Sequence, residues 1–383
     1  MSVTDWLLKP ETRELNPMDF LNALASQVRN AGVPVDYISF SVRHMHPEIA
    51  ADNLKWSPEK GADVIFRKHS FVKSDGFMKS PVALIYSEGI GLRRRLKSPL
   101  EQNDYPILHE LIRLGHTDYL IEPLQLKSDL RSYIAWSTKN VSGFSDEELS
   151  KLTSMTPLLS FVVAFISKHR ALEALLEAYL GRQAGQHVLS GEYKRGDGRS
   201  VDAIIWFSDL RNFTTFTDKH SLEQTLQRLN RSFDVIGSAI QDQGGEILKF
   251  IGDAVLAIFP ISDSLNQAAA ARCAVAAAEN ALQRLKEETS ENEEPIKVGI
   301  GIHQGLVSFG NVGTNNRLDY TVIGTPVNEC SRVESLCKEL DEEVLLTDAV
   351  AKLLPETKLR SLGENQLRGL SSSRELFSLV EKS

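Results

Sequence analysis

Two stretches in the C-terminal half decide the fold: VDAIIWFSDLRNFTTFTDKH at residues 201–220 and GGEILKFIGDAVLAIFP at residues 244–260. Their short apolar runs, rich in β-branched and aromatic residues, predict buried strands. Asp209 ends the first run, and Asp253 lies in a Gly-Asp turn between two runs that predict a hairpin. If these strands lie side by side, both carboxylates emerge at one end of the sheet, which suits a divalent-cation site for phosphoryl chemistry. The alternative, open at this point, is that one aspartate caps a helix and the other forms a turn.

The segment LRNFTTFTD follows directly after Asp209. It places polar groups between a predicted strand and a predicted helix, so its backbone N–H groups could bind an anion. No GxxxxGK[ST] sequence occurs in the chain, so a Walker A phosphate loop is excluded. Nucleotide chemistry here would need another architecture.

Five ordered motifs in the C-terminal half resemble the catalytic domain of the class III nucleotidyl cyclases: WFSDLRNFT, LNRSFD, GGEILKFIGDAVLAIF, IGIHQGLVSFGNVG and DYTVIGTPVNECSRVESL. The resemblance covers residues 201–380 and implies an α+β, ferredoxin-like catalytic domain over residues 199–383. The diguanylate cyclases, whose hairpin reads GG[DE]EF, are a partial match. That alternative fails because Gly244-Gly245-Glu246 continues with Ile247-Leu248, and the carboxylate follows only at Asp253.

The family resemblance implies an adenylate cyclase, a lyase that converts ATP to 3′,5′-cyclic AMP and pyrophosphate. The ribose 3′-hydroxyl attacks the α-phosphorus, and two Mg²⁺ or Mn²⁺ ions per site lower the hydroxyl's pKa and hold the triphosphate in line. Asp209 and Asp253 match the family's metal carboxylates, and the backbone carbonyl of Leu210 completes one ion site. Phe213 and Thr214 match the positions that offer backbone donors to the phosphates.

The second half of the implied site lies in the last motif. Asn328 matches the asparagine that orients the ribose, and Arg332 matches the arginine that stabilises charge on the α-phosphate. The two lie four residues apart on a predicted helix and therefore share one face; without the resemblance, such a pair would be read as solvated. Arg368, in QLRGL, matches a basic residue that holds the terminal phosphates.

Base choice in the family is set by two positions, here Lys249 and Thr321. Lysine with aspartate or threonine reads adenine, whereas guanylate enzymes usually carry glutamate and cysteine, so ATP is favoured over GTP. Threonine at this position also resembles a subgroup with bicarbonate-responsive members, which makes bicarbonate a candidate effector. The sequence departs from the family at Gly324-Thr325-Pro326, where Gly-Asp/Asn-Thr is usual, and at Leu306, where some members carry a polar residue.

Two alternatives stand beside the adenylate cyclase hypothesis: a guanylate cyclase and a catalytically silent nucleotide-binding regulator. Lys249 argues against the first, and the complete set of motif residues argues against the second. In the family, one protomer supplies the metal carboxylates and the other supplies the base-reading and Asn/Arg pairs. All these positions are filled in this chain, so the resemblance implies a homodimer with two complete sites at the interface.

The N-terminal part, residues 1–145, alternates helix and strand patterns. We predict helices at residues 18–31 and 105–114 and strands at residues 35–42, 64–66, 82–85, 118–123 and 132–136. The stretches DYPILHELIRLGHTDYLIEPL and GFSDEEL resemble a GAF-type α/β sensor domain, which implies an unidentified small-molecule or protein effector. This part has no cysteine, so a thioether-linked chromophore is excluded.

The histidines of the N-terminal part suggest no metal centre. His44 and His46 form an HxH pair that could contact a metal, but no further ligand lies nearby in the sequence, so a surface strand is favoured. His69, His109 and His116 are interpreted in the same way.

Residues 146–198 predict a helical linker. Ser145 and Glu148 form a capping box flanked by apolar residues, and Pro157 predicts a break, so we expect two consecutive helices, the second at residues 158–180. Apolar residues spaced by three and four along this second helix suggest a parallel coiled coil; the alternative is an amphipathic helix packed on its own domain. This seam comprises Val162, Phe165, His169, Leu172, Leu176 and Tyr179. Residues 181–198 are polar and glycine-rich, as in a flexible linker.

Composition places limits on the whole chain. Its 383 residues allow two domains, and a net charge of −8 argues against broad nucleic-acid binding. The basic run Arg93-Arg94-Arg95 is interpreted as a solvated face. We see no secretory signal and no apolar run long enough to span a bilayer, so we expect a cytoplasmic protein. The three cysteines lack a CxxC spacing and are expected to be reduced.

Overall fold

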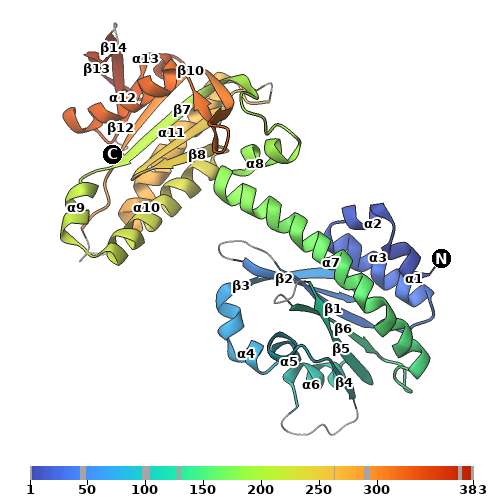
Figure 1. The fold of residues 1–383 in the computed structure, drawn as a ribbon. Coiled ribbons are helices and arrows are strands. Elements are labelled where there is room, and N and C mark those ends of the chain that lie inside the picture. Colours follow the sequence, from blue (N-terminus) through green and yellow to red (C-terminus); the bar gives the residue numbers. More distant parts are fainter. Residues whose placement is uncertain are drawn as a thin grey trace. The chain divides into compact units, whose positions relative to one another are not determined.

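The computed structural model describes residues 2–43, 49–96, 104–126, 131–262, 264–288, 294–369 and 373–380. The chain forms two compact units, Met1–Ala178 and Tyr179–Ser383, and each combines one sheet with helices (Figure 1). We call them the N-terminal unit and the C-terminal unit. Both are mixed α/β structures.

The N-terminal unit is built on a six-stranded sheet in the order β3-β2-β1-β6-β5-β4, with every neighbouring pair antiparallel. The strands are β1 (Tyr37–Arg43), β2 (Ile49–Ser57), β3 (Gly61–Lys68), β4 (Leu92–Arg95), β5 (Asp118–Gln125) and β6 (Arg131–Thr138). Helices α1 (Val3–Leu7), α2 (Pro10–Glu14), α3 (Pro17–Asn30) and α7 (Asp146–Leu180) belong to the same unit, apart from the last two residues of α7.

The two faces of this sheet have different side chains because residues alternate along each strand. On β1, Ile38, Phe40 and Val42 are buried in an apolar core shared with α3 and α7. The residues between them, among them Ser39 and Ser41, face the other side. That side is covered by a 3₁₀ turn (His69–Lys73), α4 (Asp75–Met78), α5 (Pro81–Glu88) and α6 (Pro106–Arg113).

Most of the predicted N-terminal elements are confirmed within one or two residues at their starts. The helices expected at residues 18–31 and 105–114 are α3 and α6, and the remaining strand predictions fall in β1, β3, β5 and β6. The strand expected at residues 82–85 is wrong, because this apolar run forms α5. Pro81 occupies the first turn of α5, where its fixed φ favours the helix. Strands β2 and β4 were not predicted.

Helix α7 is a single helix from Asp146 to Leu180, so the expected break at Pro157 does not occur. A proline removes one backbone N–H and frees the carbonyl four residues earlier, here that of Thr153. Pro157 and Thr153 both lie on the exposed side of the helix, where water can satisfy that carbonyl. The two predicted helices are therefore continuous.

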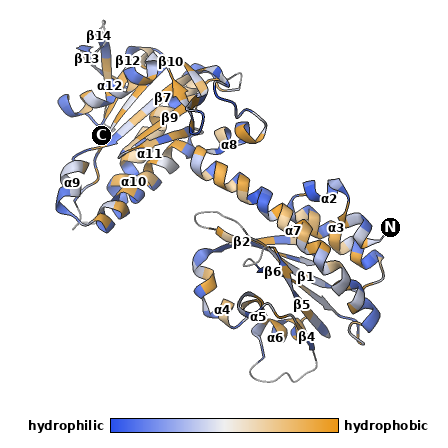
Figure 2. Cartoon of the chain, viewed as in Figure 1, coloured by the Kyte–Doolittle hydropathy of each residue, from blue (hydrophilic) through white to orange (hydrophobic). Residues whose placement is uncertain are grey.

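By length and composition alone, α7 is the one helix in the described ranges that could cross a membrane, and 44% of its apolar window is buried within the protein. Core helices of soluble proteins pass the same test. The first half of α7 contributes apolar side chains to the N-terminal core, and the helix carries hydrophobic residues along its length (Figure 2). These core residues are Leu152, Met155, Leu159, Val162, Val163 and Ile166.

The predicted seam on α7 divides into two parts. Val162 is fully buried in the core of the N-terminal unit, so it cannot belong to a surface seam. Phe165, Leu172 and Tyr179 are between 46% and 80% exposed. The alternative of packing on its own domain therefore holds for the first half of the helix, whereas the second half keeps an exposed apolar stripe.

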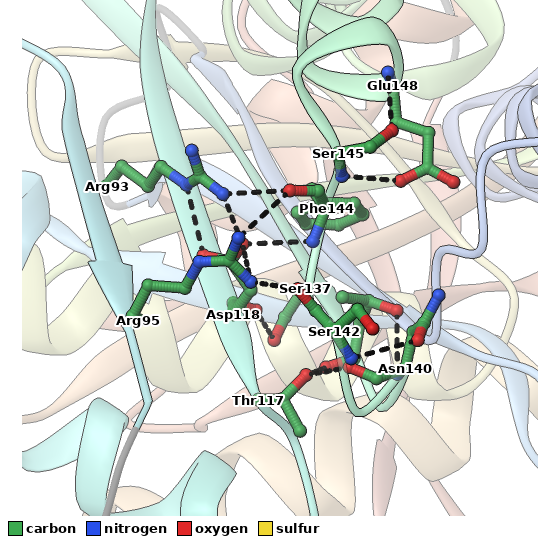
Figure 3. Close-up of polar contacts among 11 residues, drawn as sticks. Arg93, Arg95, Thr117, Asp118, Ser137, Asn140, Ser142, Phe144, Ser145 and Glu148 are labelled. Carbon is green, nitrogen blue, oxygen red and sulfur yellow. Dashed lines mark hydrogen bonds and ion pairs between the residues drawn. The ribbon is translucent and has the colours of Figure 1, made fainter.

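A polar network joins strands β4 and β5 to the start of α7 (Figure 3). Asp118 is fully buried and accepts hydrogen bonds from Arg93 Nη2 at 2.7 Å and from the backbone N–H of Phe144 at 3.0 Å. Arg95 Nη1 lies 3.4 Å from the same carboxylate. The interpretation of residues 93–95 as a solvated face is therefore wrong for Arg93, which is partly buried against Asp118, because a buried charge needs a partner of opposite sign. Arg94 and Arg95 are exposed.

The predicted capping box at the start of α7 is confirmed. The backbone N–H of Ser145 donates to Glu148 Oε2 at 2.7 Å, and the backbone N–H of Glu148 donates to Ser145 Oγ at 3.3 Å. The segment expected to be a linker, residues 181–198, instead contains α8 (Arg182–Leu189). This helix is not a free tether, because Ala184 is buried in an apolar cluster of the C-terminal unit.

The C-terminal unit contains an eight-stranded sheet in the order β13-β14-β12-β10-β7-β9-β8, with β11 paired to β10. Its strands are β7 (Gly198–Leu210), β8 (Glu246–Ile251), β9 (Ala254–Pro260), β10 (Val298–Gly313), β11 (Leu318–Ile323), β12 (Val344–Thr347), β13 (Leu359–Gln366) and β14 (Ser373–Leu379). Its further helices are α9 (Phe213–Lys219), α10 (Leu222–Asp242), α11 (Gln267–Glu288), α12 (Thr325–Glu339) and α13 (Asp348–Ala351).

Helices cover both faces of this sheet. Trp206 and Ile300 belong to the face that packs on α10 and on the alanine-rich side of α11. Ile205 and Phe309 belong to the opposite face, where Cys330 of α12 joins the same apolar cluster. The central strands β7 and β10 pair without interruption from Val298 opposite Leu210 to Gly310 opposite Gly198.

Candidate active site

The end of β7 and the β8–β9 hairpin bring Asp209 and Asp253 together. Strands β7 and β9 are antiparallel neighbours, with Asp209 opposite Ala254, the residue that follows Asp253. The turn before β9 passes through Gly252, whose φ of +65° lies in the left-handed region that favours glycine. The hairpin predicted from the sequence is present, and it places the two carboxylates at one end of the sheet.

These two carboxyl groups interact directly. Burial, the charge of Asp253 and a hydrogen bond between the two side chains raise the pKa of Asp209 to about 6. Two carboxylates this close repel each other unless a proton or a cation lies between them. An all-oxygen donor set of this kind fits Mg²⁺ or Mn²⁺.

A third carboxyl group, Glu334 of α12, lies close to this pair and was missed in the sequence. Burial and the charges of Asp209 and Asp253 together raise its pKa to about 8, with Arg211 acting in the opposite direction. Gly299 makes room for it, because a Cβ there would lie 2.7 Å from Glu334 Oε1. The sequence offered one clue to Glu334: it lies on α12, the same helix as the Asn-x-x-x-Arg pattern.

The segment after Asp209 turns immediately into α9. Leu210 is the last residue of β7, and Phe213 and Thr214 are the first two residues of α9. Asn212, with a φ of +60°, precedes the helix but forms no side-chain cap. The N–H groups at the start of a helix have no intrahelical partner, so those of this turn can serve an anion beside the carboxylate pair.

Lys249 and Thr321 lie on two strands that contact each other, β8 and β11. Lys249 Nζ forms an ion pair with Asp319 Oδ2 at 2.6 Å, and this hydrogen bond lowers the pKa of Asp319. Thr321 is two residues further along β11 and therefore lies on the same face as Asp319. Asp319 is a second residue that was not predicted from the sequence. The clue was that it lies two residues from Thr321, and residues two apart on a strand share one face.

Asn328 and Arg332 are both exposed on one face of α12, as their spacing predicts. In the described structure neither forms a hydrogen bond or ion pair with Asp209 or Asp253. The opposite face of α12 is held by buried Glu329, which accepts hydrogen bonds from Arg374 Nε and Nη2, each at 3.1 Å.

The remaining candidate residues are dispersed. Arg368 is exposed in the turn after β13 and has no recorded contact with the carboxylate pair. His69, His109 and His116 belong to no group of three or more His, Cys, Asp or Glu side chains suited to a metal, and none was found in the ranges that the structure describes. His44 and His46 lie outside the described residues.

Paired carboxylates at the end of a central antiparallel strand pair characterise domains that act on phosphate esters with divalent cations. Residues 198–380 match the family described as the adenylate and guanylate cyclase catalytic domain. The match falls within the C-terminal unit and covers just under half of the chain.

The chain is also similar to individual proteins. The chain is 31% identical over 257 residues to adenylate cyclase 1 of Rhizobium meliloti, covering 63% of this chain and 39% of that protein. It is 37% identical over 155 residues to an adenylate cyclase of Anabaena cylindrica, covering 39% of this chain and 30% of that protein. A solved bacterial light-regulated adenylyl cyclase is 29% identical, with a TM-score of 0.41, covering 47% of this chain and 91% of that chain. The chain spans less than two fifths of the length of these two curated relatives.

Proposed function

We propose that the C-terminal unit is an adenylate cyclase that converts ATP to 3′,5′-cyclic AMP and pyrophosphate. The observation that carries the proposal is the direct contact between the Asp209 and Asp253 carboxyl groups at the end of β7 and β9. The two curated relatives described above, both adenylate cyclases, support the choice of reaction. Lys249 and Thr321 support ATP as the substrate.

The proposed metal site consists of Asp209, Asp253 and the backbone carbonyl of Leu210. Bound there, two Mg²⁺ or Mn²⁺ ions would supply a lowered pKa for the ribose 3′-hydroxyl and positive charge for the triphosphate. Metal ligation requires the ionised carboxylates. Because the pKa of Asp209 is raised to about 6, protons compete with the metal below that pH, and this site should fill more readily at neutral pH.

The remaining residues bind and orient the nucleotide in this proposal. The backbone N–H groups of Phe213 and Thr214 bind phosphate oxygens, and Arg368 holds the terminal phosphates. Asn328 orients the ribose, and Arg332 stabilises the charge that develops on the α-phosphate. Each of these roles follows from the position of the residue in the matched motifs.

Base recognition is proposed for the two strands β8 and β11. Lys249 donates to adenine N1, and the Thr321 hydroxyl accepts from the exocyclic amine. A lysine ammonium has three N–H donors, so Lys249 can bond Asp319 and the base together. GTP would present its own N1–H donor to the lysine, and a mismatched donor pair disfavours binding strongly.

We propose that catalysis requires a homodimer. Within one chain, Asn328 and Arg332 face solvent and have no recorded contact with the carboxylate pair, so a second copy must supply them. The exposed apolar stripe on the second half of α7, with Phe165 and Leu172, supports a parallel helix pair between two copies.

We propose three segments for the whole chain: residues 1–145 as a GAF-like regulatory domain, residues 146–198 as a helical linker, and residues 199–383 as the catalytic domain. The six-stranded antiparallel sheet with helices on both faces supports a sensor role for the first segment. The burial of the first half of α7 in that segment supports a cytoplasmic protein. Bicarbonate is retained as a candidate effector because of Thr321.

The decisive experiment is chromatographic product analysis with purified protein, Mg²⁺ or Mn²⁺, and ATP or GTP. The proposal expects cyclic AMP from ATP and little or no product from GTP. Cyclic GMP would identify a guanylate cyclase and contradict the roles of Lys249 and Thr321. If the assay contains bicarbonate and neither metal gives a product, the result would favour a silent nucleotide-binding regulator.

A further inference from the structure

We propose that a cavity in the N-terminal unit binds a small aromatic carboxylate. The cavity has a volume of about 240 Å³ and lies between the sheet and the segment from the 3₁₀ turn to α5. At roughly 30 Å³ per water molecule it could hold about eight waters, or one ring with its substituents. The assignment gives a ligand class to the regulatory role proposed above, although binding itself does not depend on catalysis.

The cavity exists because the strands present small side chains on this face. The core face of β1 carries Ile38, Phe40 and Val42, whereas the cavity face carries Ser39 and Ser41. Ala135 of β6 stands opposite Ser39, and Ala50 and Ala51 of β2 also line the cavity. Small residues on a sheet covered by helices leave space that packing cannot close, which is typical of a preformed ligand site.

The floor of the cavity is a connected polar network. Asn53 Nδ2 donates to the Tyr133 hydroxyl and to Ser39 Oγ, the latter at 3.4 Å, and Ser39 Oγ lies 3.3 Å from the same hydroxyl. All three residues are at most 8% exposed. Burial raises the pKa of Tyr133, so its hydroxyl remains protonated at neutral pH. The floor can therefore exchange hydrogen bonds with a hydroxyl or carbonyl group.

The lining carries two cations and no carboxylate. Lys55 of β2 and Arg67 of β3 both line the cavity, and none of the other lining residues is acidic. Among the described residues, neither cation has a recorded ion pair. The Arg67 guanidinium lies over the Phe71 ring, 4.2 Å from its centroid. An uncompensated pair of cations beside a sheltered cavity favours an anion, and the fork of an arginine matches a carboxylate.

The wall opposite the sheet is aromatic. Phe77 packs edge-to-face with Phe71 at 5.9 Å and with Tyr86 at 5.5 Å between ring centroids, and all three rings line the cavity. Tyr119 of β5 and Tyr133 of β6 add aromatic surface on the sheet side. Aromatic rings favour another ring in offset or edge-to-face contact. An aromatic ring with one carboxylate and one hydroxyl matches all three features: the ring packs on the aromatic wall, the carboxylate pairs with the two cations, and the hydroxyl bonds to the polar floor.

The test is calorimetric titration of the full chain with 4-hydroxybenzoate. Three comparison ligands test these features: 4-hydroxybenzamide lacks the charge, cyclohexanecarboxylate lacks the aromatic ring and the hydroxyl, and phenyl phosphate lacks the hydroxyl and carries a phosphate in place of the carboxylate. We expect 4-hydroxybenzoate to bind with a submillimolar Kd and each comparison ligand to bind at least about tenfold more weakly. No heat with 4-hydroxybenzoate at millimolar concentration, or equal binding of the neutral amide, would overturn the proposal; equal or tighter binding of phenyl phosphate would overturn the carboxylate assignment.

Variants locate the binding. Lys55→Met with Arg67→Met should weaken 4-hydroxybenzoate binding at least about tenfold, whereas Lys60→Met, an exposed lysine outside the cavity, should leave it unchanged. Thermal unfolding and circular dichroism check that the double variant folds. Asp209→Asn should bind with unchanged affinity, because the proposed active site lies in the other unit. Binding that is lost in Asp209→Asn but kept in the double variant would place the ligand in the active site and refute this proposal, and it would leave the cyclase proposal intact.

Discussion

Lys249 and Asp319 form an ion pair of 2.6 Å between strands β8 and β11, with Asp319 two residues before Thr321. The two partners are 70 residues apart in the sequence. Their contact fixes the ammonium group beside the position proposed to read the exocyclic amine. The proposed base recognition therefore involves three residues, one more than the sequence motifs indicate.

Asp319→Asn should raise the KM for ATP several-fold with a smaller effect on kcat. The variant removes the charge that holds Lys249 in place, but it leaves the metal carboxylates intact. Steady-state kinetics with ATP at saturating metal would measure the change. Glu356→Gln, which also removes one exposed carboxylate of the C-terminal unit, is the control. An unchanged KM would mean that Asp319 does not position the lysine.

Asp209→Asn should reduce turnover by at least about 100-fold, since an amide cannot replace the charged metal ligand. The protein should remain folded.

Without metal, the raised pKa of Asp209 means that the folded state holds a proton that the unfolded chain releases. The contribution of the Asp209 carboxyl group to the free energy of unfolding is therefore fully present below pH 3.8. It is lost as the pH rises through about 6.

That loss can be measured by urea unfolding in the presence of EDTA at pH 4, 5 and 7. The unmodified protein should lose stability over this range relative to Asp209→Asn, which cannot titrate at this position. A parallel pH dependence of both proteins would show that the pKa of Asp209 is not raised in the folded protein.

Mixing two inactive variants should restore activity if the sites lie between two copies. Asp209→Asn removes one half of the proposed site, and Arg332→Ala removes the other half. With random exchange, half of the dimers are mixed and each mixed dimer has one intact site, so about a quarter of the original activity should return. Each variant mixed with itself is the control. Activity that stays at the level of the single variants would contradict the shared site.

The buried network at the start of α7 predicts unequal effects of two adjacent arginines. Arg93→Ala removes the hydrogen bonds to Asp118 and to the Phe144 carbonyl and should cost about 2–3 kcal/mol, because it leaves a fully buried carboxylate short of a partner. Arg94→Ala removes a 3.7 Å pair with Asp104 and an exposed hydrogen bond to the Arg93 carbonyl, and it should cost less than about 1 kcal/mol. Urea unfolding followed by far-UV circular dichroism compares the two. Equal effects would contradict the role given to Asp118.

Much of the catalytic segment could be predicted from the sequence. The strand that ends at Asp209, the hairpin around Asp253 and the helix that carries Asn328 and Arg332 all have the expected type and nearly the expected bounds. The reason is that strand and helix periodicity, and glycine in a tight turn, are local properties of the chain.

Errors occurred where a local pattern allowed two structures. The apolar run at residues 82–85 has the length of a strand, but Pro81 and the covering position over the sheet favour a helix. Pro157 normally breaks a helix, yet on the exposed side of α7 its cost is reduced by water. The basic run at residues 93–95 has the composition of a surface segment, but Arg93 forms a partly buried ion pair with the buried Asp118.

The sequence by itself determined the family of the catalytic segment, the order of its strands and helices, and which residues are candidates for metal and nucleotide binding. Only the tertiary structure decided which side chains meet: Asp209 with Asp253, Lys249 with Asp319, Arg93 with Asp118, and the cations and aromatic rings around the N-terminal cavity. The three named pairs join residues 25 to 70 positions apart. They depend on strand pairing and on which face of each element is buried, and no local pattern encodes the distance between two side chains that different strands carry.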